Sequence, residues 1–186
     1  MTVTGPDGQP RCTWATSAPE YIAYHDNEWG KEIRDDAGLY ERMTLEAFQS
    51  GLSWITILRK RENFRKAFAN FDPERVAAFG PDDFDRLMAD TGIVRNRLKI
   101  NAAITNAQAL LALEPGELTE LLWSFQPPER PAPKTHADVP ATTPESVAMS
   151  KAVKNKGFVF IGPTTSYALM QATGIVNDHL ADCIAR

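Results

Sequence analysis

The feature that most constrains the fold is the placement of the histidines and cysteines. The chain has 186 residues but only three histidines and two cysteines. Four of these five residues form two groups near opposite ends of the sequence: Cys12 with His25, and His179 with Cys183. Two thiols and two imidazoles suit a tetrahedral zinc site that has no open position. We therefore expect one structural zinc ion per chain to join the N-terminal and C-terminal segments.

Each of these residues also has a simpler interpretation. His25 can be a core histidine bonded to the backbone, and the two cysteines can be unrelated buried thiols. His179 and Cys183 can lie in a frayed, solvated terminus, although a spacing of four residues places them on one face of a helical turn. The metal hypothesis depends on the four residues taken together, since only His136 is left over. A disulfide is not expected in a reducing cytosol.

Composition and length indicate one globular domain. The chain is 43% hydrophobic and 24% charged, which is ordinary for a protein with a buried core. No run approaches the roughly 18–20 apolar residues of a membrane span, and the polar segment 1–11 has no signal-peptide character. We expect a disordered leader over 1–11, one domain over 12–186, and a cytoplasmic monomer. The net charge of −4 argues mildly against general nucleic-acid binding but leaves room for a local basic face.

Helical patterns cover most of the chain and strand patterns are nearly absent, so we expect an all-α fold. Capping residues predict helix starts at Asp35, Asp72 and Thr143. A helix, a tight turn and a second helix are predicted over about 87–99, which is an αα-hairpin pattern. Residues 127–144 hold six of the thirteen prolines and are expected to form a loop. Other helices are expected at about 53–69 and 118–125, and a last helix is expected from after Gly162-Pro163 to about Thr173.

Residues 21–30 combine aromatic side chains, one imidazole and two carboxylates, with little helical or strand periodicity. Such a segment costs stability unless something fixes it. We expect a metal on His25 and a binding pocket beside Tyr24 to do so.

Glu46 and Trp54 are the other candidates for this pocket. Glu46 lies in an otherwise apolar helical stretch, where a buried carboxylate costs several kcal/mol unless it is paired. It is therefore either a surface residue or a pocket acid that faces a ligand with donors or positive charge. Trp54 follows closely after Gly51, but plain core packing is the more common outcome for a tryptophan, and the same ambiguity applies to Trp14 and Trp29.

The segments 11–14, 21–30, 51–56, 60–64 and 176–179 closely resemble the family of DNA-3-methyladenine glycosylase I. The similarity runs from about Arg11 to Cys183, and the Tyr-His-Asp-Asn-Glu-Trp-Gly block at 24–30 is long and unusual. The resemblance implies the fold of the helix-hairpin-helix glycosylase superfamily, with the hairpin at about 87–99. It also implies zinc at the four Cys and His positions named above.

For the site, the resemblance implies that the excised base binds Glu46 by hydrogen bonds, Tyr24 through its hydroxyl and Trp54 by stacking, with Trp14 nearby. Glu46 is then the candidate catalytic residue. Relatives in the wider superfamily use a catalytic Asp after the hairpin, whereas residues 102–105 offer no acid. A cationic N3-methyladenine needs less acid help, because its glycosidic bond is already weakened, and aromatic faces favour it over neutral adenine.

The implied reaction is hydrolysis of the N-glycosidic bond in double-stranded alkylated DNA, without a lyase step, with the base flipped out of the stack. Free 3-methyladenine and an abasic site are the products. The hairpin is expected to contact DNA through backbone N–H groups around Gly92 and through Arg95, Arg97 and Lys99. Some of these cations can instead be simply solvated.

Two other functions remain open. A non-catalytic, zinc-stapled helical module that binds nucleic acid would keep the metal and the hairpin but treat Glu46, Tyr24 and Trp54 as core. A glycosidase acting on free nucleosides or carbohydrate would need two facing carboxylates. Only Glu46 is a clear candidate for that role, with Asp26 and Glu28 as the remaining choices.

Overall fold

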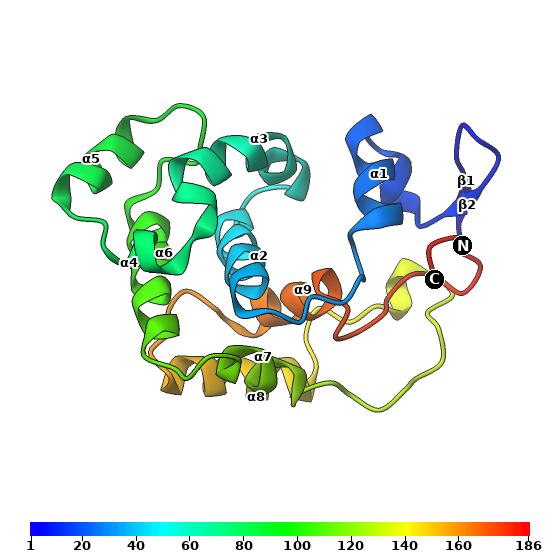
Figure 1. The fold of residues 1–186 in the computed structure, drawn as a ribbon. Coiled ribbons are helices and arrows are strands. Elements are labelled where there is room, and N and C mark those ends of the chain that lie inside the picture. The colour runs from blue at the N-terminus through cyan, green and yellow to red at the C-terminus, as the bar shows by residue number, and fades with distance from the viewer.

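The computed structural model describes residues 1–186 as a helical body with one small two-stranded sheet (Figure 1). The predicted all-α class is confirmed. None of the helices combines the length and apolar character that a membrane crossing requires. The elements in chain order are β1 (Val3–Thr4), β2 (Pro10–Arg11), η1 (Thr13–Thr16), α1 (Pro19–Asn27), α2 (Asp36–Gln49), α3 (Trp54–Ala67), η2 (Ala69–Phe71), α4 (Pro73–Ala77), α5 (Pro81–Ala89), α6 (Arg97–Leu111), α7 (Glu117–Trp123), η3 (His136–Asp138), α8 (Pro144–Asn155) and α9 (Pro163–Ala172).

The predicted helix starts are confirmed by their capping bonds. Asp35, Asp72 and Thr143 each accept hydrogen bonds from backbone N–H groups in the first turns of α2, α4 and α8. These amides have no partner within their own helix, so a side-chain acceptor stabilises each start. At the other end of α9, Gly174 adopts a φ of +77°, as the predicted glycine stop requires.

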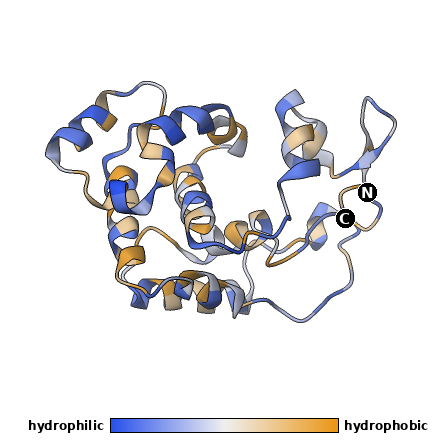
Figure 2. Ribbon diagram, in the orientation of Figure 1, coloured by the Kyte–Doolittle hydropathy of each residue, from blue (hydrophilic) through white to orange (hydrophobic).

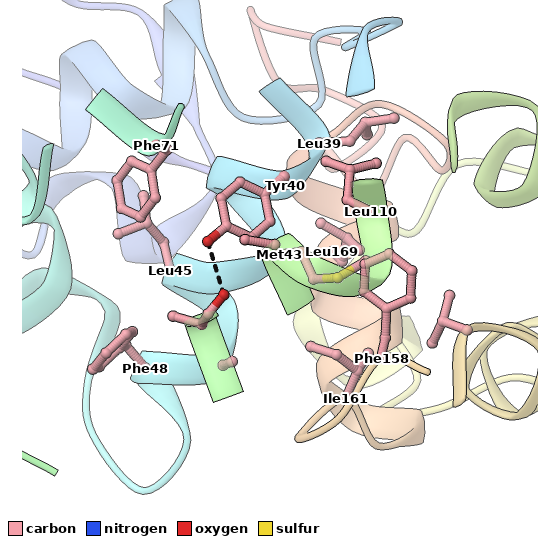
Figure 3. Packing of buried hydrophobic residues seen from close by; sticks show 14 of the residues in the cluster. Leu39, Tyr40, Met43, Leu45, Phe48, Phe71, Leu110, Phe158, Ile161 and Leu169 are labelled. Carbon is pink, nitrogen blue, oxygen red and sulfur yellow. Dashed lines mark hydrogen bonds between the residues drawn. The ribbon is translucent and has the colours of Figure 1, made fainter. Parts of the chain in front are cut away.

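One core of 30 buried residues runs through the helical body. Helix α2 crosses its centre, and residues Leu39 to Phe48, except Glu41, are buried. In Figure 3, side chains of α2 meet Phe71 on one side and Phe158, Ile161 and Leu169 on the other. Hydrophobic and hydrophilic residues alternate along most of the other helices in Figure 2, as expected for helices with one buried face.

Residues 1–11 form a β-hairpin in place of the expected disordered leader. Strands β1 and β2 pair antiparallel, with Val3 opposite Arg11. The Arg11 side chain is buried between two carboxylates, Asp7 at 2.6 Å and Asp26 at 2.7 Å. The pair with Asp26 docks the hairpin against α1, beside the C-terminal segment (Figure 1), whereas the pair with Asp7 lies within the hairpin. A composition with few apolar residues gave no sign of this order, because charged groups hold the segment.

Residues 21–30 also differ from the prediction, since most of them belong to helix α1. Its two buried residues, Tyr24 and His25, are neighbours in the sequence and point to different surroundings. A helix buried in this way has no apolar stripe at helical spacing, which explains why its periodicity is weak.

The predicted hairpin at 87–99 corresponds to α5, a connection over residues 90–96, and α6. Helix α6 begins at Arg97, because the Asn96 side chain caps it by accepting from the Lys99 amide at 3.1 Å. Helices α8 and α9 form a second, closely packed helix pair that the sequence did not suggest. Asn106 of α6 holds its turn through both backbone groups of Val159, at 2.7 and 3.1 Å.

Candidate functional site

Cys12, His25, His179 and Cys183 converge in one buried cluster, as predicted. Their ligand atoms all lie within 4.8 Å of one another. Nε2 of His25 is 3.2 Å from Nδ1 of His179 and 3.4 Å from Sγ of Cys183. Such spacings suit four ligands arranged around a single metal ion.

The local structure behind this cluster differs from the predicted helical turn at 179–183. The segment after α9 is irregular, and a turn in which the Cys183 amide donates to the Leu180 carbonyl brings Cys183 back. Sγ of Cys183 still reaches within 3.6 Å of Nδ1 of His179. Gly30, at a φ of +78°, allows His179 to approach, because a Cβ at this position would lie 3.2 Å from the imidazole.

The contacts around the cluster fit a metal ion. His25 donates its Nδ1–H to Asp26 at 2.7 Å, and His179 donates its Nε2–H to the Trp29 carbonyl at 3.0 Å. Each imidazole therefore turns its other nitrogen toward the cluster, in the tautomer that binds metal. Burial lowers the pKa of His179 to about 4, so its ring is neutral and keeps a lone pair for a ligand.

A cavity of about 320 Å³ lies beside this cluster, with Tyr21 and Tyr24 of α1 and Trp29 in its wall. The structure brings together here the four residues predicted to bind the base, from η1, α1, α2 and α3. The sequence pattern did not indicate a role for Tyr21, Gln49, Ala168 or Gln171, and it left Trp29 undecided. The lining residues are Trp14, Tyr21, Tyr24, Trp29, Glu46, Gln49, Trp54, Ala168 and Gln171.

The cavity walls are mainly aromatic. The ring centres of Tyr24 and Trp54 are 5.4 Å apart at an angle of 41°. Trp14 meets Tyr21 and Trp29 edge to face, at 5.4 and 5.1 Å. These contacts fix the rings against one another, so the walls are preformed for a flat, planar ligand.

Two buried polar atoms of the cavity have no hydrogen-bond partner: Oε2 of Glu46 and Nε1 of Trp54. Glu46 is 4% exposed and lines the cavity, so it is not a surface residue. Burial raises the pKa of Glu46 to about 7, and the nearby Arg42 opposes this shift. Unpartnered buried groups cost free energy, and in a cavity they indicate a ligand that supplies the missing bonds.

The hydroxyl of Tyr24 is held by a cation, Arg42, for which the sequence pattern indicated no role. Arg42 donates to Tyr24 Oη at 3.3 Å, and Glu28, 3.7 Å from Arg42, is itself bound by Arg61 at 2.5 and 2.9 Å. Because Arg42 donates, Tyr24 keeps its own hydroxyl hydrogen for a ligand. Burial raises the pKa of Tyr24 above its usual value, so the hydroxyl stays protonated.

The prediction of Lys99 as a DNA contact is wrong. Its side chain is buried, and Nζ donates to the carbonyls of Phe48 at 2.8 Å and Ser50 at 2.5 Å. Lys99 therefore caps the C-terminal end of α2 in place of binding phosphate. The sequence gave no sign of this, because its partners lie about fifty positions earlier in the chain.

Gly92 does not offer its amide to a ligand either, since that N–H donates to Asp90 at 2.7 Å. Arg95 and Arg97 are exposed. The guanidinium of Arg97 lies 4.9 Å over the ring of Phe84. Of the four residues predicted to bind DNA, only these two arginines present free charge at the surface.

Known proteins resemble this chain over nearly its whole length. A sequence profile described as methyladenine glycosylase matches residues 14–186. The DNA-3-methyladenine glycosylase 1 of Escherichia coli K12 is 49% identical over 177 residues, which cover 93% of this chain and 95% of that protein.

Solved structures agree with these matches. A crystal structure of 3-methyladenine DNA glycosylase I is 46% identical and superimposes with a TM-score of 0.90, over 95% of this chain and 99% of that one. A single-residue variant of 3-methyladenine DNA glycosylase I, in complex with 3-methyladenine, is 35% identical with a TM-score of 0.88, over 94% of this chain and 96% of that one. The chain belongs to the methyladenine glycosylase family.

Proposed function

We propose that this protein excises N3-methyladenine from alkylated double-stranded DNA by hydrolysing the N-glycosidic bond. The observation that carries the proposal is an aromatic cavity with two unpartnered buried polar atoms, on Glu46 and Trp54. Membership of a family whose relatives are named for this activity supports it, as does the complex of a 35% identical relative with 3-methyladenine.

The cavity matches the chemistry of a cationic, flipped base. A base must leave the stack before an enzyme can act on it, and damage makes this step easier. The faces of Tyr24 and Trp54 attract positive charge. The Glu46 carboxylate accepts hydrogen bonds from the base and complements its charge, and a positive ligand favours the ionised form of a group whose pKa lies near 7.

Cleavage follows from the charge of the base. When the glycosidic bond breaks, its electron pair returns to the ring and the base leaves neutral. Water adds its hydroxyl to the sugar carbon and releases one proton, which leaves an abasic site. No lysine lines the cavity, which supports a reaction without an amine-dependent lyase step.

We also propose that the four-residue cluster holds zinc. Two cysteines and two histidines fill a tetrahedral coordination shell, so the ion would have no position for substrate and a structural role. Held there, zinc would fix β2, α1 and the C-terminal segment around one wall of the cavity. Cys12, His25, His179 and Cys183 would be its ligands.

For DNA contact we propose Arg95 and Arg97, at the start of α6. Both are exposed, and stacking on Phe84 limits the motion of the Arg97 guanidinium. The protein is acidic and few phosphate contacts are expected, so the affinity for DNA should fall only gradually as the salt concentration rises.

The experiment is to measure release of free 3-methyladenine from methylated DNA by the wild type, Trp54→Ala and Trp54→Phe. Stacking on an aromatic face contributes about 1–3 kcal/mol per base. We expect release by the wild type, a loss of about tenfold or more in Trp54→Ala, and partial retention in Trp54→Phe. No release by folded, zinc-loaded wild type would favour the non-catalytic binding module.

A further inference from the structure

A buried hydrogen-bond network stands behind the α9 wall of the cavity. The Asp178 side chain is completely buried. Its Oδ2 accepts from Tyr167 Oη at 2.5 Å and from Gln171 Nε2 at 2.9 Å, and its Oδ1 accepts from Arg130. Arg130 also donates to Tyr167 Oη at 2.7 Å. Of these four residues only Gln171 reaches the cavity.

This network fixes the direction of the Gln171 amide. A carboxylate paired with Arg130 only accepts hydrogen bonds, so the end of the amide that faces Asp178 must be the NH₂ group. Oε1 of Gln171 is then the free end. It has no partner in the protein, and it is not among the buried unpartnered atoms, so it is accessible.

Gln171 therefore presents a fixed acceptor at the cavity wall on α9, and Glu46 presents an unpartnered acceptor on α2. Gln49, the other amide of the cavity, has no protein partner and can turn either end toward a ligand. A fixed acceptor can discriminate between bases, whereas a freely turning amide cannot. Of the two cavity amides, Gln171 is therefore the one that can discriminate, in addition to the Glu46 carboxylate.

Adenine and guanine differ in the group that such an acceptor would meet. Adenine carries an amino donor at the position where guanine carries the O6 acceptor. We infer that Gln171, oriented by Asp178, is a specificity-determining residue that accepts a hydrogen bond from the exocyclic amino group of the flipped base. The inference rests on the proposed glycosylase function. It predicts that 3-methylguanine is disfavoured, because its O6 would face Oε1 with no hydrogen between them.

Gln171→Met is the variant that tests this role. Methionine keeps the length of the side chain but removes both polar ends. Loss of one hydrogen bond to the base should lower kcat/KM for 3-methyladenine by about tenfold, a change that corresponds to about 1.4 kcal/mol. The value for 3-methylguanine should stay equal or rise, since the opposing acceptor is gone.

Asp178→Asn gives an independent test with Gln171 intact. An asparagine at 178 offers either an acceptor or a donor, so the Gln171 amide can reverse and present its NH₂ group to O6. We expect the preference for 3-methyladenine over 3-methylguanine to narrow here too. Gln108→Met, a change in an exposed amide whose Nε2 donates to the Ala77 carbonyl, is the matched control and should keep the wild-type preference.

The measurement is release of both bases from one preparation of methylated DNA, separated by chromatography, with folding checked by circular dichroism. The ratio of the two kcat/KM values is decisive, because a general structural defect lowers both together. A wild-type ratio in folded Gln171→Met would overturn the inference, whatever Asp178→Asn does. Absence of any base release by the wild type would instead contradict the proposed function, so the two failures are distinguishable.

Discussion

The cluster of Cys12, His25, His179 and Cys183 and the aromatic cavity both adjoin helix α1, but their buried polar groups are satisfied in different ways. In the cluster, His25 and His179 each use one ring nitrogen in an outer hydrogen bond and turn the other toward the remaining ligands. In the cavity, Glu46 and Trp54 are buried with polar atoms that no protein group satisfies.

Buried polar groups that have protein partners stabilise the fold, whereas those without partners are available for function. A polar group whose partners are all within the protein contributes to folding, whereas an unpartnered one costs folding free energy and is retained for a ligand. Removing a polar side chain should therefore destabilise the protein at the cluster and stabilise it at the cavity. The predictions below test this opposition.

The largest effect is expected from losing the metal. Cys183→Ala, or removal of zinc by a chelator, should lower the free energy of unfolding by several kcal/mol, because binding of a structural ion is coupled to folding. Thermal unfolding and metal content, measured on the same samples, check this. A protein that keeps its melting temperature after complete loss of metal would remove the structural role of the cluster.

At the cavity, removing the buried charge should raise the free energy of unfolding, and this gain should depend on pH. Between pH 4.5 and about 7 the unfolded chain releases the Glu46 proton while the folded chain retains it, so rising pH destabilises the fold. The effect is complete above the folded-state pKa and corresponds to about 3 kcal/mol. Glu46→Gln should therefore gain stability relative to the wild type as pH rises from about 5 to about 8, as measured by urea unfolding.

A stability difference between these two proteins that does not change with pH would show that Glu46 ionises as freely in the fold as in the unfolded chain. Arg42, the cation nearest to this carboxylate, would then compensate fully for its burial. Burial of Glu46 would then not cost folding free energy, and the cavity would not differ from the cluster in this respect.

The same substitution should impair catalysis while it stabilises the fold. Glu46→Gln removes the charge that complements the cationic base, and hydrogen bonds to charged groups contribute about 1.5–3 kcal/mol. We expect kcat/KM for release of 3-methyladenine to fall by about a hundredfold. Glu32→Gln, at an exposed carboxylate paired with Arg34, is the matched control. Equal activities of the two variants would contradict a role for Glu46 in the reaction.

The smallest effect is expected at Lys99. Lys99→Met keeps the buried stem but leaves the carbonyls of Phe48 and Ser50 without their donor, which should cost about 2 kcal/mol of stability. The salt dependence of DNA binding should not change, whereas Arg95→Ala should reduce its slope by about 1. A reduced slope in Lys99→Met would restore it as a DNA contact and refute its assignment as a cap.

The convergence of Cys12, His25, His179 and Cys183 could be predicted from sequence alone because these residue types are rare. Four of five Cys and His residues fell into two groups, and chemistry left few ways to use them. The helix caps were equally readable, since Asp35 and the other capping residues act on amides a few positions away. The resemblance to a known family added Tyr24, Glu46 and Trp54, which pattern alone left undecided.

What the sequence could not show depends on contacts made at long range. Lys99 follows a turn, as a DNA-binding cation would, yet its partners end a helix about fifty positions earlier. Gln171 lies on a helix whose position was predicted, but its importance arises from a buried carboxylate that faces it only in the folded chain. The order of residues 1–11 depends in the same way on Asp26.

The adjacency of Tyr24 and His25 on α1 has a consequence for how the protein is made. His179 lies 154 positions after His25, so it leaves the ribosome long after Glu46 and Trp54 have been synthesised. A chain interrupted before this point would contain Glu46 and Trp54. Of the four cluster residues it would contain only Cys12 and His25, so α1 and Tyr24 would lack the contacts that His179 and Cys183 make. We therefore expect the wall that α1 contributes to the cavity to be fixed only after the C-terminal segment has been synthesised.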